Sequence, residues 1–112
     1  ELISACCERI DAGGAVASEV LSLLKAVASE RAWDAVDCCL QTLGGRGYDE
    51  ANRVAQLWRD LRLLRIFEGS TEALYAHVGQ GVASSRGAVY EFLADCFPSS
   101  SAAAECFRAE IE

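Results

Sequence analysis

Apolar residues recur at intervals of three and four positions along almost the whole chain, and this spacing constrains the fold more than any other feature of the sequence. The longest such stretch covers about residues 15–43, enough for one extended amphipathic helix. Its apolar positions are Val20, Leu24, Val27, Ala28, Ala32, Ala35, Val36, Cys39 and Leu43. No segment alternates between apolar and polar residues as a half-buried strand does. The sequence therefore predicts an all-α fold.

Breaks in this pattern divide the chain into further helices. They are predicted at residues 2–12, 50–67, 71–82 and about 89–97, with a last short helix ending near Ile111. Polar residues stand where two of these helices begin. Asp49 is the predicted N-cap of the helix over 50–67, and Ser70 or Thr71 that of the next helix.

The helices predict an antiparallel bundle with additional short C-terminal helices. We assign residues 1–85 to the bundle and residues 86–112 to a helical extension. The first helix is much shorter than its predicted partner over 15–43. We therefore expect that this helix is truncated and that the chain begins inside a larger polypeptide.

Composition excludes several classes of function. The chain has 112 residues, enough for one small domain, and its 10 basic and 17 acidic residues give a net charge of −7. General nucleic-acid binding needs a basic face, so we expect no nucleic-acid partner. No apolar run approaches the roughly 20 residues that span a bilayer, so we expect no membrane span.

The six cysteines could indicate disulfides or a zinc site. Adjacent pairs lie at 6–7 and 38–39, while Cys96 and Cys106 are isolated. There is no C-x-x-C motif and only one histidine, so the spacing does not suit zinc and we expect no metal site. In alanine-rich helices a cysteine usually serves as a small buried apolar residue. Reduced, structural cysteines are therefore predicted, and with them a cytosol-like compartment.

A glycine-rich joint, QTLGGRGYDE at residues 41–50, separates two predicted helices. It is not a dinucleotide-binding fingerprint, because a helix precedes it and the spacing is G-G-x-G. One interpretation is a helix C-cap, with Gly44 or Gly45 in the left-handed region. The other is a ligand site, where backbone without side chains offers N–H groups and Gln41 adds an amide.

A second joint, IFEGSTEAL at residues 66–74, also has two interpretations. Glu68 can be a surface residue that precedes a helix break. It can equally be a general base placed beside Gly69, which leaves room for a substrate. The arginines of RDLRLLR, residues 59–65, are predicted to form salt bridges within and between helices.

The order of three motifs favours the functional interpretations. Q-x-x-G-G-x-G-Y, then R-D-x-R, then I-x-E-G-x-x-E follow one another at separations that resemble the C-terminal domain of the acyl-CoA dehydrogenase family, over about residues 1–80. The resemblance implies an FAD-dependent oxidoreductase of fatty acid metabolism. Such an enzyme oxidises the Cα–Cβ bond of an acyl thioester, with a carboxylate removing the α-proton while hydride leaves for the flavin.

The resemblance also implies roles for individual residues. Glu68 matches the catalytic base in its commonest arrangement. The positions that match family contacts to FAD are Gln41, Gly44, Gly45, Ser70, Thr71 and Glu72. The first three of these correspond to contacts with the ADP half of the FAD held by a neighbouring subunit, so a homo-oligomer is expected, with electron-transfer flavoprotein as a possible electron acceptor.

The sequence departs from the common family form E-G-T-S at Ser70 and Thr71, and Ala73 and Tyr75 replace a large apolar residue and a frequent arginine. The substrate is expected to be acyl-CoA or a carrier-protein-bound acyl group, in the cytoplasm or, in a eukaryote, the mitochondrial matrix. Two alternatives remain: a non-catalytic oligomerisation module that keeps the fold, and a flavin-dependent acyl thioester oxidase. The fragment alone is expected to be inactive.

Overall fold

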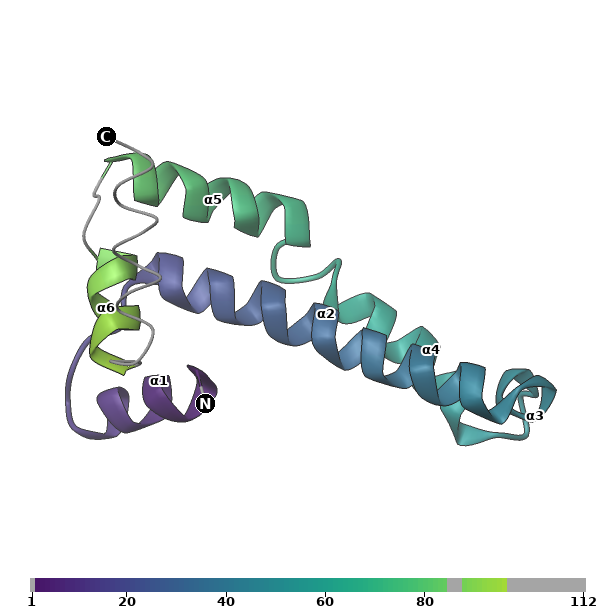
Figure 1. The fold of residues 1–112 in the computed structure, drawn as a ribbon. Coiled ribbons are helices and arrows are strands. Elements are labelled where there is room, and N and C mark those ends of the chain that lie inside the picture. Colours follow the sequence, from purple (N-terminus) through teal and green to yellow (C-terminus); the bar gives the residue numbers. More distant parts are fainter. Residues whose placement is uncertain (1, 85–87, 97–112) are drawn as a thin grey trace. The chain divides into compact units, whose positions relative to one another are not determined.

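The computed structural model describes residues 2–84 and 88–96, and every regular element in these ranges is a helix. The helices are α1 (Leu2–Asp11), α2 (Ser18–Leu43), α3 (Gly45–Tyr48), α4 (Arg53–Leu64), α5 (Thr71–Ser84) and α6 (Ala88–Cys96) (Figure 1). The all-α prediction is therefore confirmed. The predicted last helix near Ile111 lies outside the described residues.

The chain divides into two compact units, each with its own packing. The first combines residues 1–24 with residues 77–112, and the second is Lys25–Ala76. Helices α2 and α5 each contribute to both units. The predicted boundary between a bundle ending at residue 85 and an extension remains a prediction.

The first unit has a small apolar core. Cys6 of α1, Val20 of α2, and Val89 and Phe92 of α6 are buried together. The side chains packed around them are Leu2, Ala5, Val16, Ala17, Leu24, Val82 and Leu93. Helix α6, from the predicted extension, thus supplies half of the four buried residues in this core.

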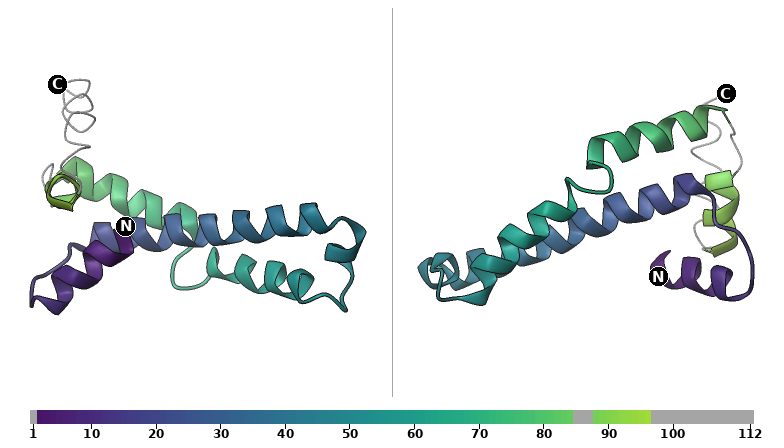
Figure 2. Two further views of the ribbon diagram at one scale, coloured as in Figure 1. Left: turned by 60° about the horizontal axis from the view of Figure 1, so that its bottom comes forward. Right: turned by 180° about the vertical axis from the view of Figure 1, so that it is seen from behind.

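In the second unit, α2 and α4 run antiparallel and are joined through the short helix α3 (Figure 2). Helix α4 begins at Arg53 rather than residue 50, because Asn52 is its N-cap and accepts a hydrogen bond from the Val54 amide at 3.0 Å. The predicted Asp49 cap is wrong. The Asp49 carboxylate instead accepts from the Ala51 amide within the preceding turn.

The cysteines depart from the predicted burial. Cys6 is buried as expected, but Cys7, Cys38 and Cys39 are exposed free thiols. Cys38 and Cys39 lie on the part of α2 that faces water, where the surrounding apolar spacing gave no sign of exposure. Cys106 lies outside the described residues.

Candidate functional site

The three positions of the joint that carry glycine differ in their structural surroundings. Gly44 lies between α2 and α3 as the N-cap of α3, with φ of 58° and ψ of −142°, a conformation that favours glycine but lies outside the left-handed helical region of the predicted C-cap. Gly47 is buried, and a Cβ there would lie 2.7 Å from the Leu40 carbonyl oxygen and 2.9 Å from the Leu43 Cβ. Close packing of α3 on α2 therefore requires a glycine at position 47.

Neither backbone conformation nor crowding requires a glycine at position 45. Its φ is not positive, and a Cβ built on it meets no atom of the described residues within 4 Å. It is exposed, as are Gln41 and Gly44 on the same joint. The described fold would therefore accept a side chain at position 45.

Backbone donors are available at this point. The Gly44 amide donates to the Gln41 carbonyl at 3.1 Å, and the Gly47 amide donates to the Gly44 carbonyl at 2.9 Å. The amides of Gly45 and Arg46, at the start of α3, donate to no backbone carbonyl of the described chain. Exposed amides without a neighbouring Cβ can bind the oxygens of a phosphate group.

Two arginines that the sequence did not single out lie beside the joint. Arg46 and Arg53 line a shallow polar depression together with Asp49, Ala51 and Asn52. Guanidinium groups pair well with phosphate oxygens, so they add positive charge where the glycine backbone is open. Nothing in a spacing of seven residues across a turn indicated that these two arginines would share one depression.

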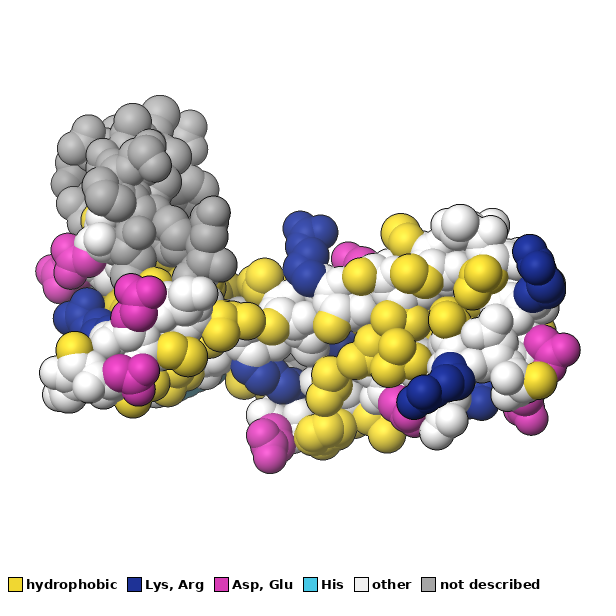
Figure 3. Space-filling model, turned by 90° about the horizontal axis from the view of Figure 1, so that it is seen from below, with side chains coloured by type: hydrophobic (Ala, Val, Ile, Leu, Met, Phe, Trp, Pro, Cys, Tyr) yellow, Lys and Arg dark blue, Asp and Glu magenta, His cyan; other side chains and the backbone are white. Residues whose placement is uncertain are grey.

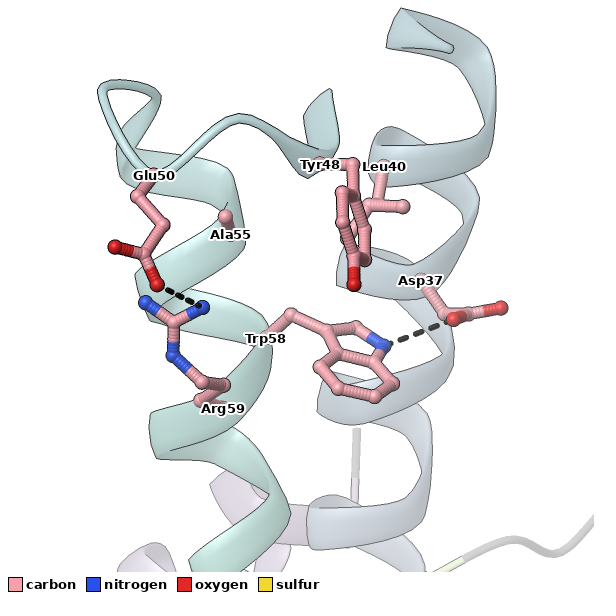
Figure 4. A pocket seen from close by; sticks show the side chains of 7 residues that line it. All are labelled: Asp37, Leu40, Tyr48, Glu50, Ala55, Trp58 and Arg59. Atoms are coloured by element: carbon pink, nitrogen blue, oxygen red, sulfur yellow. Dashed lines mark hydrogen bonds and ion pairs between the residues drawn. The ribbon is translucent and has the colours of Figure 1, made fainter. Parts of the chain in front are cut away.

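A pocket of about 320 Å³ opens between α2 and α4 next to the joint (Figure 4). Its lining residues are Asp37, Leu40, Tyr48, Glu50, Ala55, Trp58 and Arg59. Trp58 Nε1 donates to Asp37 Oδ1 at 2.8 Å, which fixes the indole across the pocket (Figure 4). Tyr48 is 79% exposed at the rim of the pocket.

Deeper in the second unit an aromatic pair links α2 and α4. The Trp33 and Trp58 rings have centroids 5.5 Å apart, and the Arg65 guanidinium lies 5.2 Å from the Trp33 ring centroid. Trp33 Nε1 is buried without a hydrogen-bond partner among the described residues. The RDLRLLR motif thus contributes a cation–π contact besides salt bridges, which join Arg59 to Glu50 at 3.9 Å and Arg65 to Glu30 at 2.7 Å.

The second predicted site lies on the loop between α4 and α5, which we call the Glu68 loop (residues 65–71). Glu68 has φ of 55°, and it is the one non-glycine residue with positive φ in the described chain. Gly69 follows with φ of 100°. Glu68 is exposed. A left-handed glutamate costs free energy, and such strain concentrates at functional sites.

Contacts from α2 hold the Glu68 loop. The carboxylate oxygen Oε1 of Glu30 accepts from Arg65 Nε at 2.7 Å and from the Thr71 hydroxyl at 2.9 Å. Lys25 Nζ donates to the Gly69 carbonyl at 2.6 Å. The loop is therefore tied down at both ends and beside Glu68, by residues 35 to 44 positions earlier in the chain.

The electrostatics of Glu30 follow from these contacts. Burial alone would raise its pKa, but the hydrogen bonds from Thr71 and Arg65 and the charges of Arg65 and Arg62 outweigh that effect. The pKa of this carboxyl therefore lies below its ordinary value of 4.5. The Glu30 and Arg65 side chains are each 24% exposed, so water weakens their attraction only in part.

This lowered pKa predicts a loss of stability in acid. The unfolded chain takes up the Glu30 proton more readily than the folded chain, so the contribution is complete above pH 4.5 and is lost as pH falls through the lower, folded pKa. In denaturant unfolding across that pH range, the free energy of unfolding should fall less steeply with acid in Glu30→Gln than in the wild type. At neutral pH this variant should be less stable by of the order of 1 kcal/mol. Equal acid slopes for the two proteins would contradict the assignment.

The three other residues expected to contact FAD, Ser70, Thr71 and Glu72, follow Gly69 in the sequence. Ser70 accepts a hydrogen bond from the Ala73 amide at 3.3 Å, which confirms it as a cap of α5. Thr71 is 6% exposed and its hydroxyl is used on Glu30, so its side chain points into the protein. Glu72 is exposed in the first turn of α5.

The glycine joint and the Glu68 loop do not meet within this chain. They lie at opposite ends of α4, whose 12 residues span about 18 Å (Figure 2). The structure thus brings Gln41, Gly44 and Gly45 together in one place, and Glu68, Ser70 and Glu72 in another.

Among the described residues, no group of three or more histidine, cysteine, aspartate or glutamate side chains could hold a metal ion. Over the same ranges, none of the helices combines the length and apolar character that a bilayer crossing requires.

Comparison with known proteins gives one family. The sequence model for the acyl-CoA dehydrogenase C-terminal domain matches residues 1–83. The mitochondrial very long-chain specific acyl-CoA dehydrogenases of Bos taurus and Homo sapiens are 42% identical to this chain over 53 residues, and that of Rattus norvegicus is 40% identical. The match covers 47% of this chain but only 8% of each of these relatives. No solved structure gives a significant match.

Proposed function

The chain belongs to the acyl-CoA dehydrogenase family, whose C-terminal domain it carries, and we propose that within a complete enzyme it contacts FAD and supplies the catalytic base. The glycine joint holds the ADP half of FAD, and Glu68 removes the α-proton of an acyl thioester. Bound FAD supplies the acceptor for the β-hydrogen, which leaves as hydride. The single observation that carries this proposal is the left-handed backbone of Glu68 on a loop held by α2.

The conformation of Glu68 supports its role as the base. A residue with positive φ can end a helix, but glycine or asparagine adopts that conformation at a lower cost in free energy than glutamate. The loop instead keeps an exposed carboxylate in this conformation, beside Gly69. Glu68 would then accept the α-proton at a carboxylate oxygen, with its direction of approach set by the loop.

The glycine joint supports the contact with FAD. Gly45 is free of both backbone strain and crowding, so its lack of a side chain is explained by the approach of a ligand. The open amides of Gly45 and Arg46 would bind diphosphate oxygens, and Arg46 and Arg53 would balance their charge. Gln41, exposed one turn earlier, adds an amide that can donate and accept.

Separation of the two sites favours an oligomer. A joint about 18 Å from the base, at the far end of α4, suits the FAD of a neighbouring subunit better than the FAD that serves Glu68. Large apolar side chains also gather on one face of the second unit (Figure 3). The exposed large apolar residues of this unit include Leu43, Leu57, Leu63, Ile66 and Phe67. Exposed apolar surface of this kind marks a protein interface, in this case with another subunit or with the rest of the enzyme.

The relatives suggest where to begin with substrate and compartment. They are named as very long-chain specific and mitochondrial, so we propose long-chain acyl-CoA as the first substrate to test and the mitochondrial matrix as the first compartment. Ala73 and Tyr75 lie just after the Glu68 loop and depart from the common family form, so chain-length preference is the property most open to change.

A complete enzyme that carries this domain should be purified with bound FAD, and its flavin should bleach when an acyl-CoA is added without oxygen. The product should be the trans-2-enoyl thioester. Reoxidation by air with one hydrogen peroxide formed per turnover would favour the oxidase alternative. A folded, oligomeric protein that never retains flavin would favour the non-catalytic module and would contradict the proposal.

A further inference from the structure

We propose that Lys25 and Glu30, both on α2, are positioning residues for Glu68. This inference rests on the proposed role of Glu68 as the base. It concerns how the chain fixes the direction of the carboxylate, and it assigns to α2 a function in the reaction besides its packing. In the described part of the chain neither residue forms a hydrogen bond or an ion pair with the Glu68 side chain, so both would act through the backbone of the loop.

Glu30 closes the Glu68 loop at its two ends. A single carboxylate oxygen binds Arg65, where α4 ends, and Thr71, where α5 begins. The Thr71 amide also donates to the Arg65 carbonyl at 3.2 Å. The five residues between Arg65 and Thr71 must therefore form a tight loop whose two ends are fixed. This restricts the backbone conformations open to Glu68 and Gly69.

Lys25 holds the loop at Gly69, between these two fixed ends. Its ammonium group donates to the Gly69 carbonyl at 2.6 Å, a short charge-assisted hydrogen bond. Lys25 and Glu30 are five residues apart, so they hold the loop at points about 7.5 Å apart along α2. Rotation of the peptide that follows Gly69 would break the Lys25 contact, so this bond fixes the backbone one residue beyond Glu68 and limits the conformations open to Glu68 itself.

Strain makes these anchors necessary. A left-handed non-glycine residue costs about 1–2 kcal/mol, and such conformations persist where the surroundings determine them. Without the anchors, Glu68 would relax toward negative φ and swing its carboxylate away. A misplacement of roughly 1 Å at a reacting group can slow a reaction by about 100-fold.

The test uses the complete enzyme and single-turnover flavin reduction by an acyl-CoA. Lys25→Met removes the donor and keeps the length of the side chain, and Lys25→Arg restores a donor. Glu30→Gln weakens the second anchor independently. The matched control is Arg31→Met on the same helix, because the Arg31 side chain is 81% exposed and its one ion pair among the described residues is with Asp34.

We expect Lys25→Met to slow flavin reduction about 10- to 100-fold, with unchanged flavin content and unchanged spectral binding of the acyl-CoA. Lys25→Arg should recover most of the rate, Glu30→Gln should slow it in the same direction, and Arg31→Met should match wild type. In a Glu68→Gln background, Lys25→Met should cause no further loss, because a residue that acts through Glu68 has nothing left to position.

Wild-type rates in both Lys25→Met and Glu30→Gln would overturn the inference while leaving the role of Glu68 intact. The same proportional loss from Lys25→Met with and without the Glu68 carboxylate would also overturn it, since Lys25 would then act independently. A wild-type rate in Glu68→Gln alone would overturn both this inference and the proposed base.

Discussion

Glu68→Gln in the complete enzyme is expected to slow flavin reduction by an acyl-CoA at least about 100-fold, which corresponds to roughly 2.7 kcal/mol in the barrier. Glutamine keeps the shape of the side chain and removes its ability to take a proton. The variant should still bind FAD and acyl-CoA, because the proposed FAD contacts at the glycine joint lie at the other end of α4. Stopped-flow bleaching of the flavin measures the effect directly.

The exposed carboxylate of Asp60, on α4, provides the matched control, and Asp60→Asn should reduce flavin at the wild-type rate. Glu68→Gly adds an independent signature. It relieves the positive φ of 55° and removes the base, so it should raise the free energy of unfolding by up to about 1 kcal/mol while the reaction is lost. Bleaching of Glu68→Gln at the wild-type rate would place the base elsewhere.

Gly45→Val is expected to produce a folded enzyme that loses its FAD. The described chain leaves open space at this position, so valine should fit the fold and its branched side chain should intrude only on the ligand. Removing a close backbone contact to a diphosphate should raise the dissociation constant of FAD by at least about tenfold, or roughly 1.4 kcal/mol. Flavin content after dialysis, followed by titration of the apoenzyme with FAD, measures the loss. Gln41→Ala should act in the same direction.

Gly79→Val is the matched control for this substitution. Gly79 lies on α5, is exposed, has no positive φ, and also has open space around its position. Valine is a better helix former than glycine, so this substitution should keep α5 intact and leave FAD bound. Gly47→Ala supplies the opposite case, since its Cβ would press on the α2 backbone and lower stability by about 1–3 kcal/mol. Full flavin content in a folded Gly45→Val enzyme would contradict the assignment of the joint.

The helices could be predicted from the sequence because their apolar spacing is a local property. The residues at which they begin and end were predicted less accurately. Asp49 and Asn52 are both good caps three residues apart, and propensity alone does not choose between them. The choice is made by a turn in which the Asn52 amide donates to the Asp49 carbonyl at 2.9 Å. That turn uses Asp49 before α4 can begin.

Within the candidate site, the motifs identified Glu68 and the glycine joint, whereas the supporting residues were invisible. Lys25 and Glu30 reach the Glu68 loop across 35 to 44 positions of sequence, and no spacing rule relates them to it. The sequence also could not show that the three glycines differ. Gly44 has a positive φ, Gly47 is crowded by α2, and Gly45 has open space around it. Only the packing of α3 on α2 distinguishes them.

The different reasons for Gly45 and Gly47 separate two kinds of inherited or engineered defect. A substitution at Gly47 strains the fold, so in a cell the protein would be cleared by proteases and its abundance would fall. A substitution at Gly45 would leave the packing of the chain intact and weaken FAD binding, so the protein would lose only the stability that bound FAD contributes. A larger supply of the vitamin from which FAD is made would restore bound cofactor by mass action in the second defect and would leave the first untouched.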